Sequence, residues 1–108
     1  MSTDNGYVRA CAVADVPDEG AVHVDIGDTP VAIVRSEGEL YAIYDVCSHA
    51  YVPLSEGEIE DGEIECWLHG SCFDLRSGKP TGLPATKPVP VYSVRTEGDD
   101  VYVSLATA

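Results

Sequence analysis

The chain has 108 residues and a mass of 11.5 kDa, the size of one domain. Six Lys and Arg residues stand against 19 Asp and Glu residues, so the formal net charge is −13 at pH 7. Such an acidic surface repels nucleic-acid phosphates and anionic lipids, and no apolar run has the length of a membrane span or a signal peptide. We therefore expect a cytoplasmic protein that binds neither nucleic acid nor membranes. The acidity suits either a basic protein partner or a high-salt habitat.

Short runs rich in Val, Ile and Tyr alternate with turn signals along the chain. Within residues 21–26, for example, Val22, Val24 and Ile26 alternate with other residues, which is the period of a half-buried strand. The expected strands, in chain order, cover residues 7–13, 21–26, 30–35, 39–46, a hairpin at 59–64, 89–96 and 100–105. No capped, amphipathic helix is found. The sequence therefore predicts an all-β, antiparallel fold of about eight to ten short strands.

A loop-rich segment interrupts this β pattern. Residues 45–84 hold three of the four cysteines and two of the three histidines, and their strand patterning is weaker. Prolines at positions 80, 84, 88 and 90 make the segment that follows stiff and extended. We therefore predict a single domain over residues 1–108, with a small subdomain at about 45–84 inserted into a β scaffold.

Two short loops each pair a cysteine with a histidine. One residue separates Cys47 from His49, two separate Cys66 from His69, and sixteen lie between the pairs. Structural zinc modules usually pair like ligands, as Cys-x₂₋₄-Cys and His-x₃₋₅-His, and neither spacing is present. A [2Fe–2S] cluster needs two ligands on each iron, and mixed loops could give both cysteines to one iron and both histidines to the other. The pattern favours the cluster, with a structural zinc module as the alternative.

The spacing Cys-x-His, sixteen residues, Cys-x-x-His resembles the Rieske iron–sulfur signature. Residues 69–75 and the return segment 78–91 extend the resemblance over essentially the whole chain. It implies a stand-alone Rieske-type ferredoxin, an antiparallel β sandwich or barrel with the cluster in the inserted subdomain. The implied ligands of one [2Fe–2S] cluster per chain are Cys47, His49, Cys66 and His69. The residues implied to lie around that cluster are Ser71, Phe73, Trp67, Leu68 and, in a third loop, Pro84.

Departures from the respiratory Rieske proteins predict a low reduction potential. Histidine ligation places such clusters at roughly −150 to +300 mV, against about −400 mV for four cysteines. By resemblance, the extra loop cysteines of the respiratory proteins correspond to Val52 and Leu68, so their bridging disulfide is excluded here. The position of a hydrogen-bonding tyrosine is Phe73, which has no donor. Because fewer donors stabilise the reduced cluster less, we expect a potential in the lower part of the range.

The resemblance implies an electron carrier and not an enzyme. Small ferredoxins of this kind serve bacterial multicomponent oxygenases, including aromatic-ring-hydroxylating dioxygenases of hydrocarbon catabolism. They take electrons from an NAD(P)H-dependent flavin reductase and deliver them to a Rieske non-haem-iron terminal oxygenase, here through docking at His49 and His69. The chain has no phosphate loop, nucleophile signature, or nicotinamide or flavin fingerprint. The small subunit of an assimilatory nitrite reductase, which has a similar scaffold, is the alternative.

The remaining reactive side chains are expected to be structural. Cys11 lies in a strand pattern and is predicted to be a buried thiol, and Cys72 to pack beside the second loop. His23 lies on the polar side of its strand, so we expect it to be solvated. The acidic run 56–65 is expected to form a solvated face that could guide docking.

Overall fold

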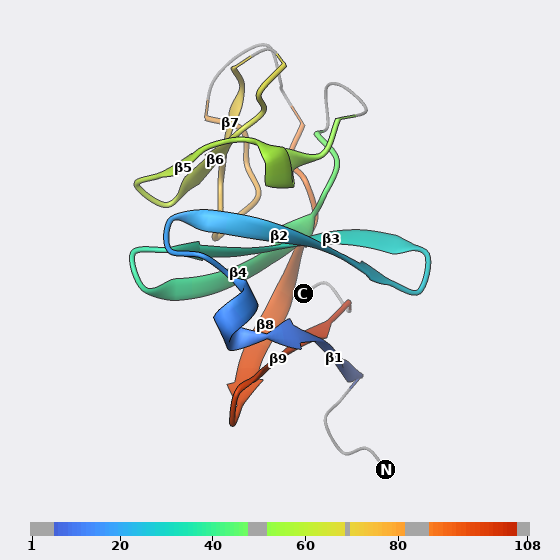
Figure 1. Cartoon of the computed structure of the whole chain (residues 1–108). Helices are drawn as coiled ribbons and strands as arrows, with labels where there is room; N and C mark the ends of the chain where they lie inside the picture. Colours follow the sequence, from blue (N-terminus) through green and yellow to red (C-terminus); the bar gives the residue numbers. More distant parts are fainter. Residues whose placement is uncertain (1–5, 48–51, 69, 82–86, 106–108) are drawn as a thin grey trace.

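The computed structural model describes residues 6–47, 52–68, 70–81 and 87–105, which form nine strands and two short 3₁₀ helices (Figure 1). The strands are β1 (Tyr7–Ala12), β2 (Gly20–Ile26), β3 (Thr29–Ser36), β4 (Glu39–Tyr44), β5 (Ile59–Glu60), β6 (Glu63–Glu65), β7 (Cys72–Asp74), β8 (Val91–Glu97) and β9 (Asp100–Ser104). The 3₁₀ helices are η1 (Val13–Asp15) and η2 (Leu54–Glu56). No helix in these described ranges is long and apolar enough to cross a membrane.

The strands form two antiparallel sheets. The larger has six strands in the order β1-β9-β8-β4-β3-β2, and it curls until its two edge strands, β1 and β2, come into contact. The smaller has the order β5-β6-β7 and lies with η2 over one face of the β2–β3–β4 region (Figure 1). The all-β, antiparallel prediction is confirmed, in the form of a curled half-barrel that carries a small second sheet.

Most predicted strands match the observed ones closely, and the differences have local causes. The strand predicted for residues 7–13 ends at Ala12, because Val13 begins η1. The strand predicted for residues 39–46 ends at Tyr44, because the next residue, Asp45, lies opposite Pro30, which accepts the N–H of Asp45 (3.0 Å) but has no N–H to donate in return. The strand β7 was not expected, since three residues are too few to show a period.

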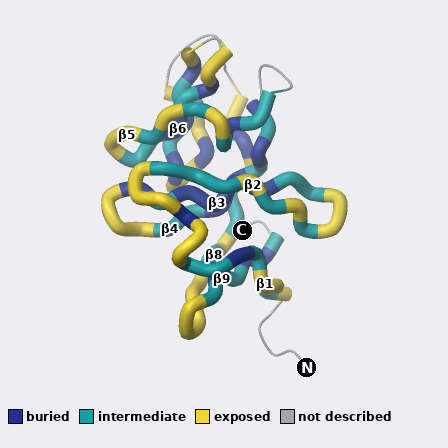
Figure 2. The backbone as a smooth tube through the Cα atoms, viewed as in Figure 1, coloured by how far each residue is buried: buried dark blue, intermediate teal, exposed yellow. Residues whose placement is uncertain are grey.

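Strand β3 lies between two hydrophobic cores. Its residues Val31, Ala32, Ile33 and Val34 are all fully buried, and the dark stretch along β3 in Figure 2 marks them. Val31 and Ile33 pack into a core inside the curled sheet, with residues of β1 and β9. Ala32 and Val34 point to the other face and pack into the core beneath the subdomain. The subdomain is therefore supported directly by β3, the strand next to the edge strand β2.

Candidate metal centre

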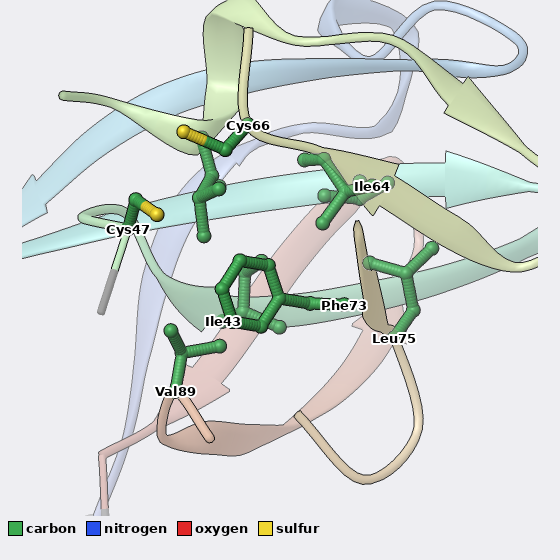
Figure 3. Close-up of a cluster of buried hydrophobic side chains, with 10 residues drawn as sticks. Ile43, Cys47, Ile64, Cys66, Phe73, Leu75 and Val89 are labelled. Atoms are coloured by element: carbon green, nitrogen blue, oxygen red, sulfur yellow. The ribbon is translucent and has the colours of Figure 1, made fainter. Parts of the chain in front are cut away.

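The two cysteines of the paired loops lie in one buried cluster. Cys47 follows β4 and Cys66 follows β6, and their exposed fractions are 3% and 0%. Both pack into the core beneath the subdomain together with Phe73 and Val89. Figure 3 shows the two sulfur atoms at the same side of that cluster. The fold therefore places in one cluster two thiols that are nineteen positions apart in the sequence.

The same hydrogen bond closes both cysteine loops. The N–H of Cys47 donates to the carbonyl of Val52 (3.0 Å), and the N–H of Cys66 donates to the carbonyl of Ser71 (2.6 Å). In each loop the cysteine is thus bonded to the residue five positions later. Gly70, with a φ of +79°, donates a further N–H to the carbonyl of Cys66 (2.8 Å). The two loops are therefore built alike at their bases.

This donor set fits a metal–sulfur centre. Two buried cysteine sulfur atoms lie at one side of an apolar cluster, and such surroundings limit the access of water to a metal and tune its potential. The predicted ligands His49 and His69 lie outside the described residues, as does Pro84. Among the residues that are described, no group of three or more His, Cys, Asp or Glu could hold a metal ion. The structure thus brings together the two cysteines of the predicted ligand set.

The other residues expected around the centre fall into a buried pair and an exposed pair. Ser71 and Phe73 are fully buried, Ser71 at the base of the second loop and Phe73 in the cluster with the cysteines. Trp67 and Leu68, which follow Cys66, are 50% and 45% exposed. These two apolar side chains therefore lie at the surface beside the second loop and not in the core.

The two remaining cysteines are both free thiols, but their surroundings differ. Cys11 is 8% exposed and lies in the core of the curled sheet, which confirms the predicted buried thiol, and burial raises its pKa. Cys72 lies beside the second loop, as predicted, with its Sγ 3.9 Å from the carbonyl oxygen of Gly70, and its half-buried side chain also lines an acidic hollow. That hollow is formed with Glu58, Glu60, Asp61, Glu63 and Glu65. Burial, with help from the Glu65 and Glu63 carboxylates, raises the pKa of the Cys72 thiol.

A buried carboxylate beside the first loop was not anticipated from the sequence. Asp45 is 1% exposed and accepts hydrogen bonds from both the N–H and the hydroxyl of Ser55 (2.6 Å each). It accepts a third from Nδ1 of His23 (2.6 Å), whose Nε2 donates to Asp25 (2.9 Å). His23 is exposed to solvent, as expected, with 44% of its side chain accessible, but the sequence did not predict its bonds to two carboxylates. The available signal was an acidic residue at the end of an apolar strand pattern.

The two carboxylates fix the charge of His23. Ionised carboxylates can only accept hydrogen bonds, so a ring bonded to two of them must carry a proton on each nitrogen. The hydrogen bond to Asp45 raises the pKa of His23 above the ordinary value of 6.5, and the bond to Asp25 adds to this effect against the opposing influence of burial. The two bonds therefore favour the imidazolium form of His23.

This raised pKa predicts how His23 contributes to stability as the pH changes. Because the folded protein binds the proton more tightly than the unfolded chain, the stabilisation is complete below the unfolded pKa of about 6.5 and is lost as pH rises through the folded pKa. We expect an NMR titration to place the pKa of His23 above 6.5. We also expect His23→Ala to reduce the free energy of unfolding more at pH 6 than at pH 9. A pKa at or below 6.5 would contradict the network.

A family model and a curated relative both match nearly the whole chain. The model of the Rieske [2Fe-2S] domain matches residues 6–93. The 3-phenylpropionate/cinnamic acid dioxygenase ferredoxin subunit of Escherichia coli (strain K12) is 43% identical over 102 residues, which cover 94% of this chain and 95% of the relative.

Solved structures give the same result for the fold. The ferredoxin of carbazole 1,9a-dioxygenase from Nocardioides aromaticivorans IC177 matches with a TM-score of 0.86 and 35% identity, over 91% of this chain and 96% of that chain. A chain in a complex of reduced oxygenase and oxidised ferredoxin in carbazole 1,9a-dioxygenase matches with a TM-score of 0.88 and 31% identity, over 97% and 98% of the two chains. A nitrite reductase small subunit, at 23% identity and a TM-score of 0.78, shares the fold. The chain therefore belongs to the Rieske [2Fe-2S] domain family, and its cofactor is a [2Fe–2S] cluster.

Proposed function

We propose that this protein is a one-electron carrier of an aromatic dioxygenase system in the cytoplasm. It takes electrons from an NAD(P)H-dependent flavin reductase and passes them to a Rieske non-haem-iron terminal oxygenase. The observation that carries this proposal is the pair of buried cysteines, Cys47 and Cys66, in two like loops of a chain that matches ferredoxin components over nearly its whole length. A bound [2Fe–2S] cluster supplies reversible one-electron transfer.

The proposed ligands are Cys47 and Cys66 on one iron and His49 and His69 on the other. The chain's own part is to hold the two sulfur atoms at a fixed separation and to keep water from them. The backbone hydrogen bonds from Cys47 and Cys66 fix the positions of the sulfur atoms, and the buried ring of Phe73 excludes water from them. With all four ligands on the cluster, there is no open position for a substrate, so the protein carries electrons and catalyses no reaction of its own.

The surface beside the second loop suits contact with a protein. Trp67 and Leu68 expose apolar side chains between two proposed ligands, Cys66 and His69. We propose that His49 and His69 dock against the partner and provide the exit for the electron, with the two apolar side chains closing the contact around them. A related system has been solved as a complex of reduced oxygenase and oxidised ferredoxin, which supports the oxygenase as one partner.

An acidic face contributes electrostatic attraction to docking. Exposed carboxylates lie along η2 and the β5–β6 hairpin, at Glu56, Glu58, Glu60 and Asp61. Such a face attracts a basic partner surface and accelerates encounter at low salt. We therefore expect electron transfer to the oxygenase to slow steadily as ionic strength rises, because the charges are screened. If the rate does not respond to salt, the acidic composition does not serve docking and is better explained as an adaptation to a high-salt habitat.

Electron paramagnetic resonance on anaerobically purified protein, before and after dithionite, tests the proposal. We expect a silent oxidised state and a rhombic signal on reduction, with two iron and two sulfide per chain and a midpoint potential below zero. Addition of reductase and NAD(P)H should produce the same signal, and oxygenase should remove it. A colourless protein with one zinc per chain would favour the structural module instead, and selective electron delivery to a sirohaem enzyme would favour the nitrite reductase subunit.

A further inference from the structure

Asp45 joins three separate parts of the molecule. Its carboxylate accepts hydrogen bonds from Ser55 in η2 and from His23 in β2, and its N–H donates to Pro30 in β3. Ser55 lies next to Leu54, which is fully buried in the core that also holds Cys47. Asp45 therefore ties the segment around the first cysteine loop to the scaffold.

The carboxylate also closes the first loop from outside. Asp45 lies two residues before Cys47, and Ser55 lies three residues after Val52. The bonds between Asp45 and Ser55 therefore join the two ends of the segment that contains the bond from Cys47 to Val52. The loop is thus closed twice, first by its backbone and then by a side chain.

The second loop is closed in a different way. Directly outside the bond from Cys66 to Ser71, Glu65 pairs with Cys72, and the ladder between β6 and β7 continues from there. The flanks of the first loop, Asp45–Val46 and Pro53, belong to no strand in the described structure. The bonds of Asp45 therefore hold the two ends of the first loop together, as strand pairing holds the two ends of the second.

A buried carboxylate can serve this purpose only if its charge is compensated. An ionised carboxylate without partners in the core would be strongly destabilising. The two donors of Ser55 and the imidazolium of His23 supply the compensation, and His23 adds an anchor on the edge strand β2.

We propose that Asp45, held by His23 and Ser55, is the positioning residue that fixes the first cluster-binding loop. Loss of its carboxylate frees the segment between residues 46 and 54, and with it the sulfur of Cys47, while the second loop keeps its shape. This inference rests on the proposed function only in taking Cys47 as a ligand.

The test compares Asp45→Asn with Asp25→Asn in the cluster-loaded protein. Both changes remove one negative charge and one carboxylate partner of His23, but only the first weakens the closure of the loop, because an amide offers Ser55 one uncharged acceptor oxygen where the carboxylate offers two charged ones. The readouts are hydrogen–deuterium exchange over residues 46–54 and 66–71, and the rate of iron release to a chelator. Because bonds to a charged group are lost, we expect Asp45→Asn to speed both exchange over 46–54 and iron release by about tenfold. Exchange over 66–71 and the Asp25→Asn protein should change less than about twofold.

A second pair of variants isolates the serine hydroxyl. Ser55→Ala removes one of the bonds to Asp45, so exchange over 46–54 should rise by less than in Asp45→Asn, while Ser55→Thr retains the hydroxyl and should restore the slow rate. The proposal is overturned if Asp45→Asn behaves like Asp25→Asn, or if both loops loosen equally. If Asp45→Asn does not fold, equal exchange over 46–54 in Ser55→Ala and Ser55→Thr overturns it. Failure of the proposed function would appear differently, as unaltered protein that contains no iron.

Discussion

Replacement of Cys66 by serine is expected to leave less than about a tenth of the normal iron in the purified protein, because we propose the buried thiolate as a ligand and a serine hydroxyl stays protonated at neutral pH. The side chain of Cys66 is fully buried beside Cys47. Water therefore cannot take its place as a ligand without opening the core. Iron and sulfide analysis, with the visible spectrum of the same sample, measures the loss.

Cys72→Ser is the matched control for this change. Cys72 lies six residues later, and its half-buried side chain lines the acidic hollow. We expect this variant to keep its full iron content and spectrum. Far-ultraviolet circular dichroism of both variants separates loss of the cluster from loss of the fold. Full iron in Cys66→Ser, or loss of iron in Cys72→Ser, would show that the ligands are assigned wrongly.

The substitution Gly57→Ala is expected to destabilise the subdomain by about 3 kcal/mol, at the upper end of what overpacking costs. Gly57 follows η2, and a Cβ atom there would lie 1.6 Å from the carbonyl oxygen of Glu65. Its φ of −88° suits any residue, so only the contact excludes a side chain. Glu65 is held by the bond of its N–H to Glu58 (2.8 Å), so η2 or β6 must move. Urea unfolding measures the loss of stability.

Gly38→Ala provides a control in which strain is present without a clash. Gly38 has a φ of +82°, and nothing lies within 4 Å of a Cβ atom built there. An alanine in this conformation costs about 1 kcal/mol. The cluster should also be released faster from Gly57→Ala than from Gly38→Ala, because Glu65 precedes Cys66. Equal stability of the two variants would mean that the approach of Gly57 to Glu65 is not tight in the protein.

The sequence predicted the scaffold well because its strands are long enough to show their period. Residues 21–26 alternate clearly, and the observed β2 covers them. The strand β7 and the two 3₁₀ helices have three residues each, and no period can be recognised over so short a length. Strand β3 reads as a continuous apolar run, and its burial on both faces depends on the subdomain that folds over it.

The closeness of the two cysteine loops could be predicted because the proposed ligand types fall at fixed local spacings. The network around Asp45 could not, since His23, Asp45 and Ser55 are far apart in the sequence and each residue type alone is ordinary at a surface. Their meeting depends on the pairing of β2 with β3 and on the position of η2. The exposure of Trp67 and Leu68 also could not be predicted, because the sequence fits a buried position for these side chains as well as an exposed one.

The placement of β3 between two cores makes its length more constrained than its composition. Val31 and Ile33 serve the curled sheet, while Ala32 and Val34 serve the subdomain. An exchange of one apolar residue for another alters the packing of one core only. Insertion or deletion of a single residue would rotate every following side chain to the opposite face and damage both cores at once. We therefore expect β3 to tolerate substitution of one apolar residue by another, but not the insertion or deletion of a residue.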